Sequence, residues 1–570
     1  MNTEPLQAGI LEPVFAIRTE DDLGLGDTEG VRQMIDWCAR HRLQVFQTLP
    51  INETSDDNSP YNAISSLALE PGIIAVSPRH LPDLTPAKFR QWAQPRLLRE
   101  LRKGRVNYPK AKALKFALLQ AAFDFFWHRH WQKNSARAGD FRRFLLENAS
   151  WLSDYALFRV LMEENGHIPV WERWLPEHRT PQQAQTWLLS LPEKRREELV
   201  RRQLFFCYVQ WIAFGQWKVL KNYAQQRRVM LMGDIPFGVG RCSADVWANR
   251  DIFDLDWSGG APPETVFKAD AFTEKWGQNW GIPKYRWDVL RRRNFDWWRT
   301  RVDILRRNFH LYRIDHVLGF FRIYSFPWTP EHNAEFLPLD MTQAAAKTGG
   351  RIPGFKEFPD DTPEHKEANQ SHGEEILRMV LESSGDTGVI AEDLGVVPDY
   401  VPTTLQKLDV PGFRIPAFFR EQDGSYSDPA HYPRLSLTQP ATHDHPPLAA
   451  VWAEHWREID AGQNVEDNRR ELRRILDFAR LGPEHAPREF TADLLEAYLR
   501  RLAQSNSRFV VVMITDVFGQ TARFNTPGAV SDENWSTRME QTVAGLDKDP
   551  ALLAKTESYA RAMEEAGRGG

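Results

Sequence analysis

The segment Leu311-Tyr312-Arg313-Ile314-Asp315-His316 is a short, mostly apolar run that ends in polar side chains. A stretch with helical periodicity, residues 294–309, comes directly before it. Seven other short runs, rich in strand-forming residues, also end in polar or turn residues: residues 10–18, 43–50, 229–236, 388–394, 412–416, 435–443 and 509–516. Helical patterns such as residues 28–42 separate most of them. Strands that alternate with helices predict a parallel sheet covered by helices.

Eight such units predict that the sheet closes into a (β/α)8 TIM barrel, an α/β fold in which residues 1–570 form a single domain. Residues 85–228, between the second and third strands, carry Leu, Phe and Trp at helical spacing and predict an inserted helical subdomain. Residues 237–287 and 329–364 are rich in turn residues with weak periodicity, so we expect long active-site loops there. Residues 447–507 are again predicted to be helical.

The composition is that of an ordinary globular chain. The 570 residues include 72 Lys and Arg against 77 Asp and Glu, and this formal charge of −5 gives no basic excess for nucleic-acid binding. We see no signal-peptide pattern and no apolar stretch of bilayer length. Cys38, Cys207 and Cys242 lack the C-x-x-C spacing of a zinc ribbon and are too few for a disulfide framework. We therefore expect a cytoplasmic protein that binds neither membranes nor nucleic acids.

Acidic and histidine side chains follow several of the predicted strands. In a barrel of this kind the chemistry takes place at the carboxyl ends of the strands. Those ends carry the acidic residues Asp234, Asp315, Glu392, Asp393, Asp444 and Asp516. These residues are the first candidates for a catalytic site.

Arg313 and Asp315 are two residues apart on one predicted strand, so their side chains leave the same face. A neighbouring guanidinium favours the ionised form of a carboxyl group, and we expect Asp315 to be charged at neutral pH, as a carboxylate nucleophile must be. An ion pair that only closes the top of the barrel is the alternative.

Glu392 and Asp393 are adjacent, so strand alternation sends them to opposite sides and at most one faces the site. Spacing leaves open which one does, although Asp393, followed by Leu-Gly, suits a cap or loop hydrogen bond. A protonated carboxyl group opposite Asp315 is a candidate general acid. A separation of about 5 Å between two carboxyl groups would predict a retaining double displacement.

A metal or cofactor has little support in the sequence. His443, Asp444 and His445 are residue types that bind zinc or iron, and a metal-dependent hydrolase is one alternative. No H-E-x-x-H set, dinucleotide fingerprint, P-loop or G-x-S-x-G motif accompanies them. We predict no metal and no cofactor.

Aromatic residues are unusually frequent, with 21 Trp, 13 Tyr and 33 Phe. Most lie at helical spacing and are predicted to pack the core. Four lie in irregular segments where a flat ring can stack on a ligand or anchor its own loop: Tyr61, Trp276, Trp280 and Trp287.

The chain resembles the 4-α-glucanotransferases, the amylomaltase or disproportionating-enzyme family, glycoside hydrolase family 77. The resemblance spans nearly the whole chain and rests on an ordered set of motifs: Gln47-Thr48-Leu49-Pro50, Asn58-Ser59-Pro60-Tyr61, Gly233-Asp234-Ile235-Pro236, residues 243–247, Gly260-Ala261-Pro262-Pro263, Gly277-Gln278-Asn279-Trp280-Gly281, Tyr285-Arg286-Trp287, Arg313-Ile314-Asp315-His316, Glu392-Asp393-Leu394-Gly395, Thr442-His443-Asp444 and Asn525-Thr526-Pro527-Gly528. The chain departs from the common pattern at Ile282 and at His445-Pro446-Pro447, and residues 277–283 and 313–322 look more like the plant cytosolic disproportionating enzyme.

The resemblance implies a role for each site residue. Asp315 would be the nucleophile, Glu392 the acid/base and Asp444 the third carboxylate, which stabilises the transition state. The residues implied to bind sugar are Tyr61, Asp234, Arg313, His316 and His443 on the donor side and Trp280 on the acceptor side. The implied substrates are maltose, maltooligosaccharides or a glycogen-like α-glucan. A retaining α-glucan hydrolase and a non-catalytic glucan-binding barrel are the alternative functions.

Overall fold

The computed structural model describes residues 5–263, 270–482, 486–527 and 531–569. Its central feature is a parallel sheet of eight strands, in the order β11-β8-β5-β2-β1-β14-β13-β12. The strands are β1 (Gln7–Leu11), β2 (Val45–Gln47), β5 (Met230–Ile235), β8 (Leu311–Ile314), β11 (Gly388–Ala391), β12 (Gly412–Arg414), β13 (Ser436–Thr438) and β14 (Phe509–Met513). Each strand therefore neighbours the next one along the chain, and β14 pairs with β1. This is the predicted (β/α)8 barrel.

The barrel closes between β11 and β12, the two ends of the strand order, through a few individual hydrogen bonds and one ion pair. The Ala391 amide donates to the Pro411 carbonyl oxygen at 2.8 Å. Asp393, just beyond β11, accepts a hydrogen bond from the Phe413 amide at 2.6 Å and pairs with Arg414 at 3.2 Å. A Cβ on Gly412 would lie 2.7 Å from the Asp393 carboxylate, so glycine leaves the space that this contact needs.

All eight predicted strands are present, with shorter limits. The first begins earlier than predicted and ends at Leu11, because the chain then forms a 3₁₀ turn, Val14–Ala16. The last ends at Met513, and Ile514–Val517 is a short helix, α20. Asp516 therefore does not end a strand: it accepts a hydrogen bond from the Leu448 amide, at the start of helix α17.

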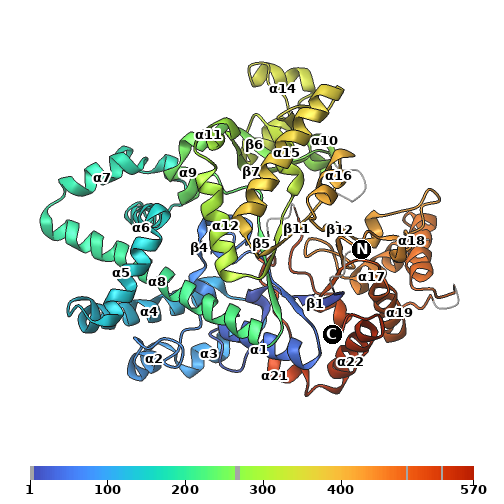
Figure 1. Ribbon diagram of the computed structural model, residues 1–570, viewed down its shortest axis with the longest axis horizontal. Helices are drawn as coiled ribbons and strands as arrows, with labels where there is room; N and C mark the ends of the chain where they lie inside the picture. The colour runs from blue at the N-terminus through green and yellow to red at the C-terminus, as the bar shows by residue number, and fades with distance from the viewer. Residues whose placement is uncertain (1–4, 264–269, 483–485, 528–530, 570) are drawn as a thin grey trace.

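Helices surround the barrel (Figure 1). The predicted helices 28–42 and 294–309 are α1 (Thr28–Arg40) and α12 (Asp296–Asn308). Asp27 caps the start of α1 by accepting hydrogen bonds from two of its first amides. The outer layer also contains α15 (Pro363–Ser384), α16 (Tyr400–Lys407), α17 (Leu448–Asp460), α18 (Val465–Phe478), α19 (Ala492–Ala503) and α22 (Pro550–Glu565).

A block of helices lies between β2 and β5 in the chain, at the left of Figure 1. It follows a two-stranded hairpin of β3 (Asn52–Thr54) and β4 (Ala63–Leu69). Its helices are α2 (Pro86–Trp92), α3 (Pro95–Leu101), α4 (Tyr108–Phe126), α5 (Ala136–Glu147), α6 (Ala149–Glu164), α7 (Pro181–Ser190) and α8 (Glu193–Gln226). Helix α8 also belongs to the barrel layer, because its C-terminal half bonds to α1 through Gln216–Thr28 and Tyr223–Asp36.

The two long excursions are more regular than predicted. They contribute to an antiparallel sheet of β10 (Gly354–Lys356), β9 (Ile323–Phe326), β6 (Phe253–Ala261) and β7 (Gln278–Tyr285). Short helices flank this sheet: α9 (Ala244–Ala248), α10 (Ala271–Trp276), α11 (Trp287–Arg292), α13 (Asn333–Phe336) and α14 (Met341–Lys347). Part of the first excursion, residues 264–269, lies outside the described residues. Among the residues that are described, no helix is long and apolar enough to cross a membrane.

We predict that Asp393→Ala destabilises the barrel. The change leaves Arg414 and the Phe413 amide without their carboxylate partner, and we expect the free energy of unfolding to fall by about 3 kcal/mol. Urea denaturation followed by circular dichroism measures the effect. The control is Asp399→Ala, since Asp399 is exposed and makes no side-chain cap bond. Equal transition midpoints for the two variants would contradict the prediction.

Candidate active site

Arg313 occupies the centre of the site. Its Nη1 pairs with Asp234 Oδ2 at 2.7 Å, and its Nη2 pairs with Asp315 Oδ1 at 2.6 Å. The same Nη2 lies 3.9 Å from Glu392 Oε2. The arginine is 4% exposed. One buried guanidinium thus brings together carboxyl groups from the ends of β5, β8 and β11.

Asp315 and Glu392 both approach Nη2 of this guanidinium. Because one nitrogen reaches both, the two bonded oxygens are no farther apart than the sum of 2.6 and 3.9 Å. That limit admits the roughly 5–5.5 Å separation of retaining glycosidases and lies at the lower end of the roughly 6.5–9.5 Å of inverting ones. The geometry therefore favours a double displacement.

His316 fixes the position of Glu392. Its φ of 47° places its backbone in the left-handed region, which is uncommon for a residue with a side chain. In this conformation the His316 amide donates to Glu392 Oε2 at 2.7 Å. The Glu392 amide in turn donates to the Ile314 carbonyl oxygen at 2.9 Å. The strained turn after β8 thus holds the carboxyl group that ends β11.

The buried carboxyl groups do not all favour the charged form. Burial raises the pKa of Glu392 to about 8, although Arg313 opposes the shift. Burial raises the pKa of Asp234 to about 7 in the same way. Asp315 makes the shortest of the three contacts with Arg313, at 2.6 Å. Burial thus keeps Glu392 protonated at neutral pH, as a general acid must be.

Asp444 lies on the loop after β13. Its Oδ2 is 3.3 Å from His443 Nε2, and its Oδ1 accepts a hydrogen bond from Asn525 Nδ2 at 2.6 Å. Burial acts to raise the pKa of Asp444, but His443 and the Asn525 hydrogen bond outweigh it, and the pKa is lowered. Asp444 is therefore an ionised third carboxylate.

Aromatic rings form one wall of the site. The Tyr61 hydroxyl donates to Asp234 Oδ2 at 2.7 Å, and its ring stacks on His443 with 5.1 Å between centroids and 5° between planes. The ring of Trp535 lies 5.9 Å from each of these two rings. Sequence reasoning missed Trp535, because neither ring partner is near it in the chain.

Of the three candidate tryptophans, only Trp280 is exposed. Its side chain is 38% exposed and meets the His316 ring edge-to-face at 4.8 Å. Trp276 is buried in a small cluster and donates to the Phe336 carbonyl oxygen, and Trp287 is buried against Trp298. Of the two roles considered for Trp276 and Trp287, their burial favours the anchoring of their own segments over stacking on a ligand.

Asp393 does not face the site. Its bonds to Phe413 and Arg414 make it the hydrogen-bonded partner of the adjacent strand, as its sequence context suggested. His445, the third member of the suggested metal set, bonds through Nδ1 to Thr442 Oγ1 at 2.7 Å. Across the part of the chain that the structure describes, no group of three or more His, Cys, Asp and Glu could hold a metal ion.

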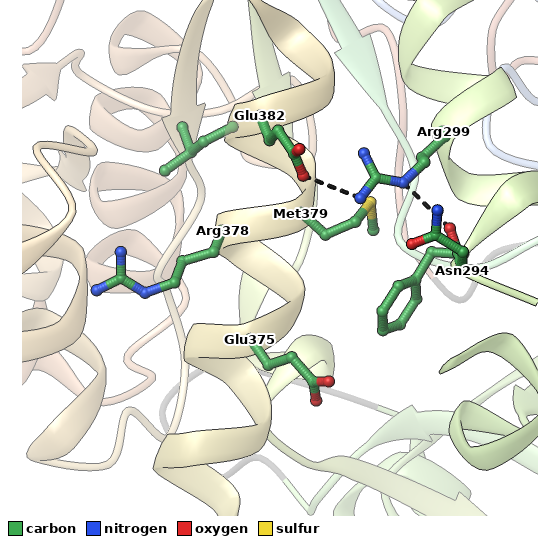
Figure 2. Close-up of a pocket in the computed structure, with 8 residues that line it drawn as sticks. Asn294, Arg299, Glu375, Arg378, Met379 and Glu382 are labelled. Atoms are coloured by element: carbon green, nitrogen blue, oxygen red, sulfur yellow. Dashed lines mark hydrogen bonds and ion pairs between the residues drawn. The ribbon is translucent and has the colours of Figure 1, made fainter. Parts of the chain in front are cut away.

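A cavity of about 460 Å³ lies elsewhere, on the outer layer between α12 and α15 (Figure 2). Arg299 of α12 crosses it to pair with Glu382 of α15 at 2.9 Å. None of the site residues above lines it. It is a groove between two neighbouring helices of the barrel.

Comparison with known families identifies the family of the chain. A family model described as 4-alpha-glucanotransferase matches residues 12–543. The chain belongs to the 4-α-glucanotransferase family. This membership confirms the predicted enzyme class, and neither the hydrolase nor the non-catalytic alternative is favoured.

The chain is similar to curated members of the family, in one case over nearly its full length. It is 30% identical to the 4-alpha-glucanotransferase of Chlamydia caviae over 549 residues, which cover 94% of this chain and 91% of the relative. It is 32% identical to rice 4-alpha-glucanotransferase DPE2 over 330 residues, 56% of this chain and 32% of the relative. The amylomaltase from Streptococcus agalactiae, solved with acarbose, has the same fold, with a TM-score of 0.75 and 22% identity over 99% of this chain and all of that one.

The structure brings the sequence-predicted site residues of the chain together at one end of the barrel. Asp234, Arg313, Asp315 and Glu392 share one network, and Tyr61, His443 and Asp444 adjoin it. Asn525 belonged to a recognised motif, but its bond to Asp444 was not foreseen. Gly528 of that motif lies outside the described residues.

We predict an alkaline limit on the activity of the glucanotransferase. A general acid must carry its proton, and burial keeps Glu392 protonated until the pH passes its pKa of about 8. We expect kcat/KM to fall about tenfold per pH unit above this value. Initial rates measured across pH give the profile. Glu392→Gln is expected to abolish most of the activity and, in what remains, the decline of kcat/KM at alkaline pH. A wild-type rate that stays constant to about pH 10 would contradict the assignment.

Proposed function

We propose that this protein transfers α-1,4-linked glucosyl or maltooligosyl units between glucans through a covalent glycosyl-enzyme. Asp315 is the nucleophile, Glu392 the acid/base and Asp444 the stabilising carboxylate. One observation carries the proposal: Arg313 pairs with Asp315 at 2.6 Å and lies 3.9 Å from a protonated Glu392, in a chain of the 4-α-glucanotransferase family.

In the first step an Asp315 oxygen attacks the anomeric carbon of the donor. The glycosidic C–O bond breaks, and Glu392 gives its proton to the departing oxygen. In the second step Glu392 takes the proton of the acceptor 4-hydroxyl, whose oxygen attacks the anomeric carbon and releases Asp315. Asp444, held by Asn525, stabilises the positive charge that develops on the sugar ring.

The polar residues around the nucleophile suit a neutral sugar. Burial lowers the pKa of His316 to about 4 and also lowers that of His443, so both imidazoles are neutral at pH 7. Neutral rings exchange hydrogen bonds with hydroxyl groups without attracting anions. With Tyr61, Asp234 and Arg313 they form the donor-side site, and the exposed Trp280 covers the acceptor side.

The substrates that we propose are maltose, maltooligosaccharides or a glycogen-like α-glucan. The S. agalactiae amylomaltase was solved with acarbose, a ligand of that protein. A cytoplasmic location is part of the same proposal, because Cys38, Cys207 and Cys242 are all free thiols.

Incubation with maltotriose alone tests the transfer reaction. Transfer yields glucose together with maltotetraose and longer chains, whereas hydrolysis yields only glucose and maltose. We expect Asp315→Asn to lower the rate by about a thousandfold or more, because no other group forms the glycosyl ester. Chromatographic separation of the products measures both outcomes.

The matched control is Asp393→Asn, next to Glu392 in sequence. Its amide oxygen can still accept the Phe413 hydrogen bond, so the folded variant should retain transfer. Products limited to glucose and maltose, or equal losses in Asp315→Asn and Asp393→Asn, would refute the proposal. Loss of activity on addition of a chelator would favour the metal-dependent alternative.

A further inference from the structure

Trp535 has an unusual backbone for a large side chain. Its φ of 59° lies in the left-handed region, where bulky residues are rare and are held by their surroundings. Its indole is 6% exposed. The ring lies 5.9 Å from Tyr61 and 5.9 Å from His443, tilted by 45° and 46°. It therefore packs against both Tyr61 and His443, whose stacked rings we call the donor-side stack.

The strained backbone of Trp535 is held from two directions. Its amide donates to the Phe524 carbonyl oxygen at 2.7 Å. Its own carbonyl oxygen accepts a hydrogen bond from the Tyr108 hydroxyl at 2.5 Å. The next residue is tied as well, because the Val106 amide donates to the Ser536 carbonyl oxygen at 2.8 Å. The start of α4 thus binds the chain directly at and after Trp535.

The same face of α4 also holds the hairpin that leads to Tyr61. Lys112 lies four residues after Tyr108, and its Nζ is 5.4 Å from the Tyr108 ring centroid. This Nζ donates to Thr54 Oγ1 at 2.8 Å and pairs with Glu70 Oε2 at 3.3 Å. Thr54 ends β3, from which the chain runs to Tyr61. One helix face therefore anchors both the segment of Trp535 and the hairpin that carries Tyr61.

We propose that Trp535 is a positioning residue that fixes the orientation of the stacked Tyr61 and His443 rings. Tyr108 and Lys112 of α4 hold the segment of Trp535 and the hairpin of Tyr61 in place relative to each other. This inference rests on the proposed function, because the stack is where the donor sugar binds. Trp535 does not touch the reacting atoms. It acts by fixing the ring of Tyr61, whose hydroxyl bonds to Asp234.

Trp535→Leu tests this role against Trp217→Leu. Trp217 is a buried residue of α8 whose ring packs on Phe309. Donor stacking acts in both the ground state and the transition state, so its loss raises KM more than it lowers kcat. We expect KM for maltotriose to rise about tenfold in Trp535→Leu and not in Trp217→Leu. Trp535→Phe, which keeps an aromatic ring, should recover most of the loss.

A double-mutant cycle separates positioning from general stability. In a Tyr61→Ala background the ring that Trp535 positions is gone, so Trp535→Leu should raise KM by less than about threefold. The inference would be overturned if the effects of Tyr61→Ala and Trp535→Leu on KM were fully additive. It would also be overturned if Trp535→Leu changed KM no more than Trp217→Leu does. A wild-type enzyme without transfer activity would overturn the proposed function instead.

Tyr108→Phe gives a second test if Trp535→Leu does not fold. It removes only the hydroxyl that bonds to the Trp535 carbonyl oxygen and leaves the indole in place. We expect KM to rise about threefold with little change in kcat, since a single neutral hydrogen bond is lost. An unchanged KM would overturn the assignment of Tyr108 as the anchor.

Discussion

The ion pairs of Arg313 are the interaction on which the site depends. A carboxyl group from β5, one from β8 and one from β11 meet around a single buried cation. Without it these groups would lie close together with no compensating charge, which is costly in a desolvated environment. The guanidinium lies 2.6 Å from Asp315, 2.7 Å from Asp234 and 3.9 Å from Glu392. One buried side chain thus permits three carboxyl groups to lie close together in a desolvated site.

Strand alternation gives the two acidic residues after β11 separate tasks. Glu392 turns toward Arg313 and the His316 amide. Asp393 turns toward β12 and bonds to Phe413 and Arg414, where the ring of strands has few other hydrogen bonds. The barrel is therefore closed immediately beside its acid/base candidate. The closure uses the Asp393 carboxylate, and the neighbouring Glu392 carboxyl group is held separately by the His316 amide.

The barrel could be predicted from sequence because its strands are short apolar runs, buried on both faces, that alternate with amphipathic helices. The antiparallel sheet of β6, β7, β9 and β10 could not. Gly259 and Gly260 in β6 and Pro283 in β7 have low strand propensity, and the pairing joins segments far apart in the chain. The carboxylates and Tyr61 were found because each follows a strand or belongs to a motif. Trp535 was missed because a left-handed φ and two distant ring partners leave no pattern in the sequence.

In the proposed reaction the two aromatic sides of the site have different physical roles. The donor-side rings are packed against one another and anchored through α4, which suits a site that must hold a sugar while it becomes covalently bound. Trp280 is exposed and contacts the site through the edge of His316. His316 therefore lies between the two sides, because its amide holds Glu392 while its ring meets Trp280. Glu392 acts on the leaving oxygen and then on the acceptor oxygen, and both occupy the Trp280 side. A ring that covers this side and excludes water raises the chance that the second oxygen belongs to a sugar, and this favours transfer over hydrolysis.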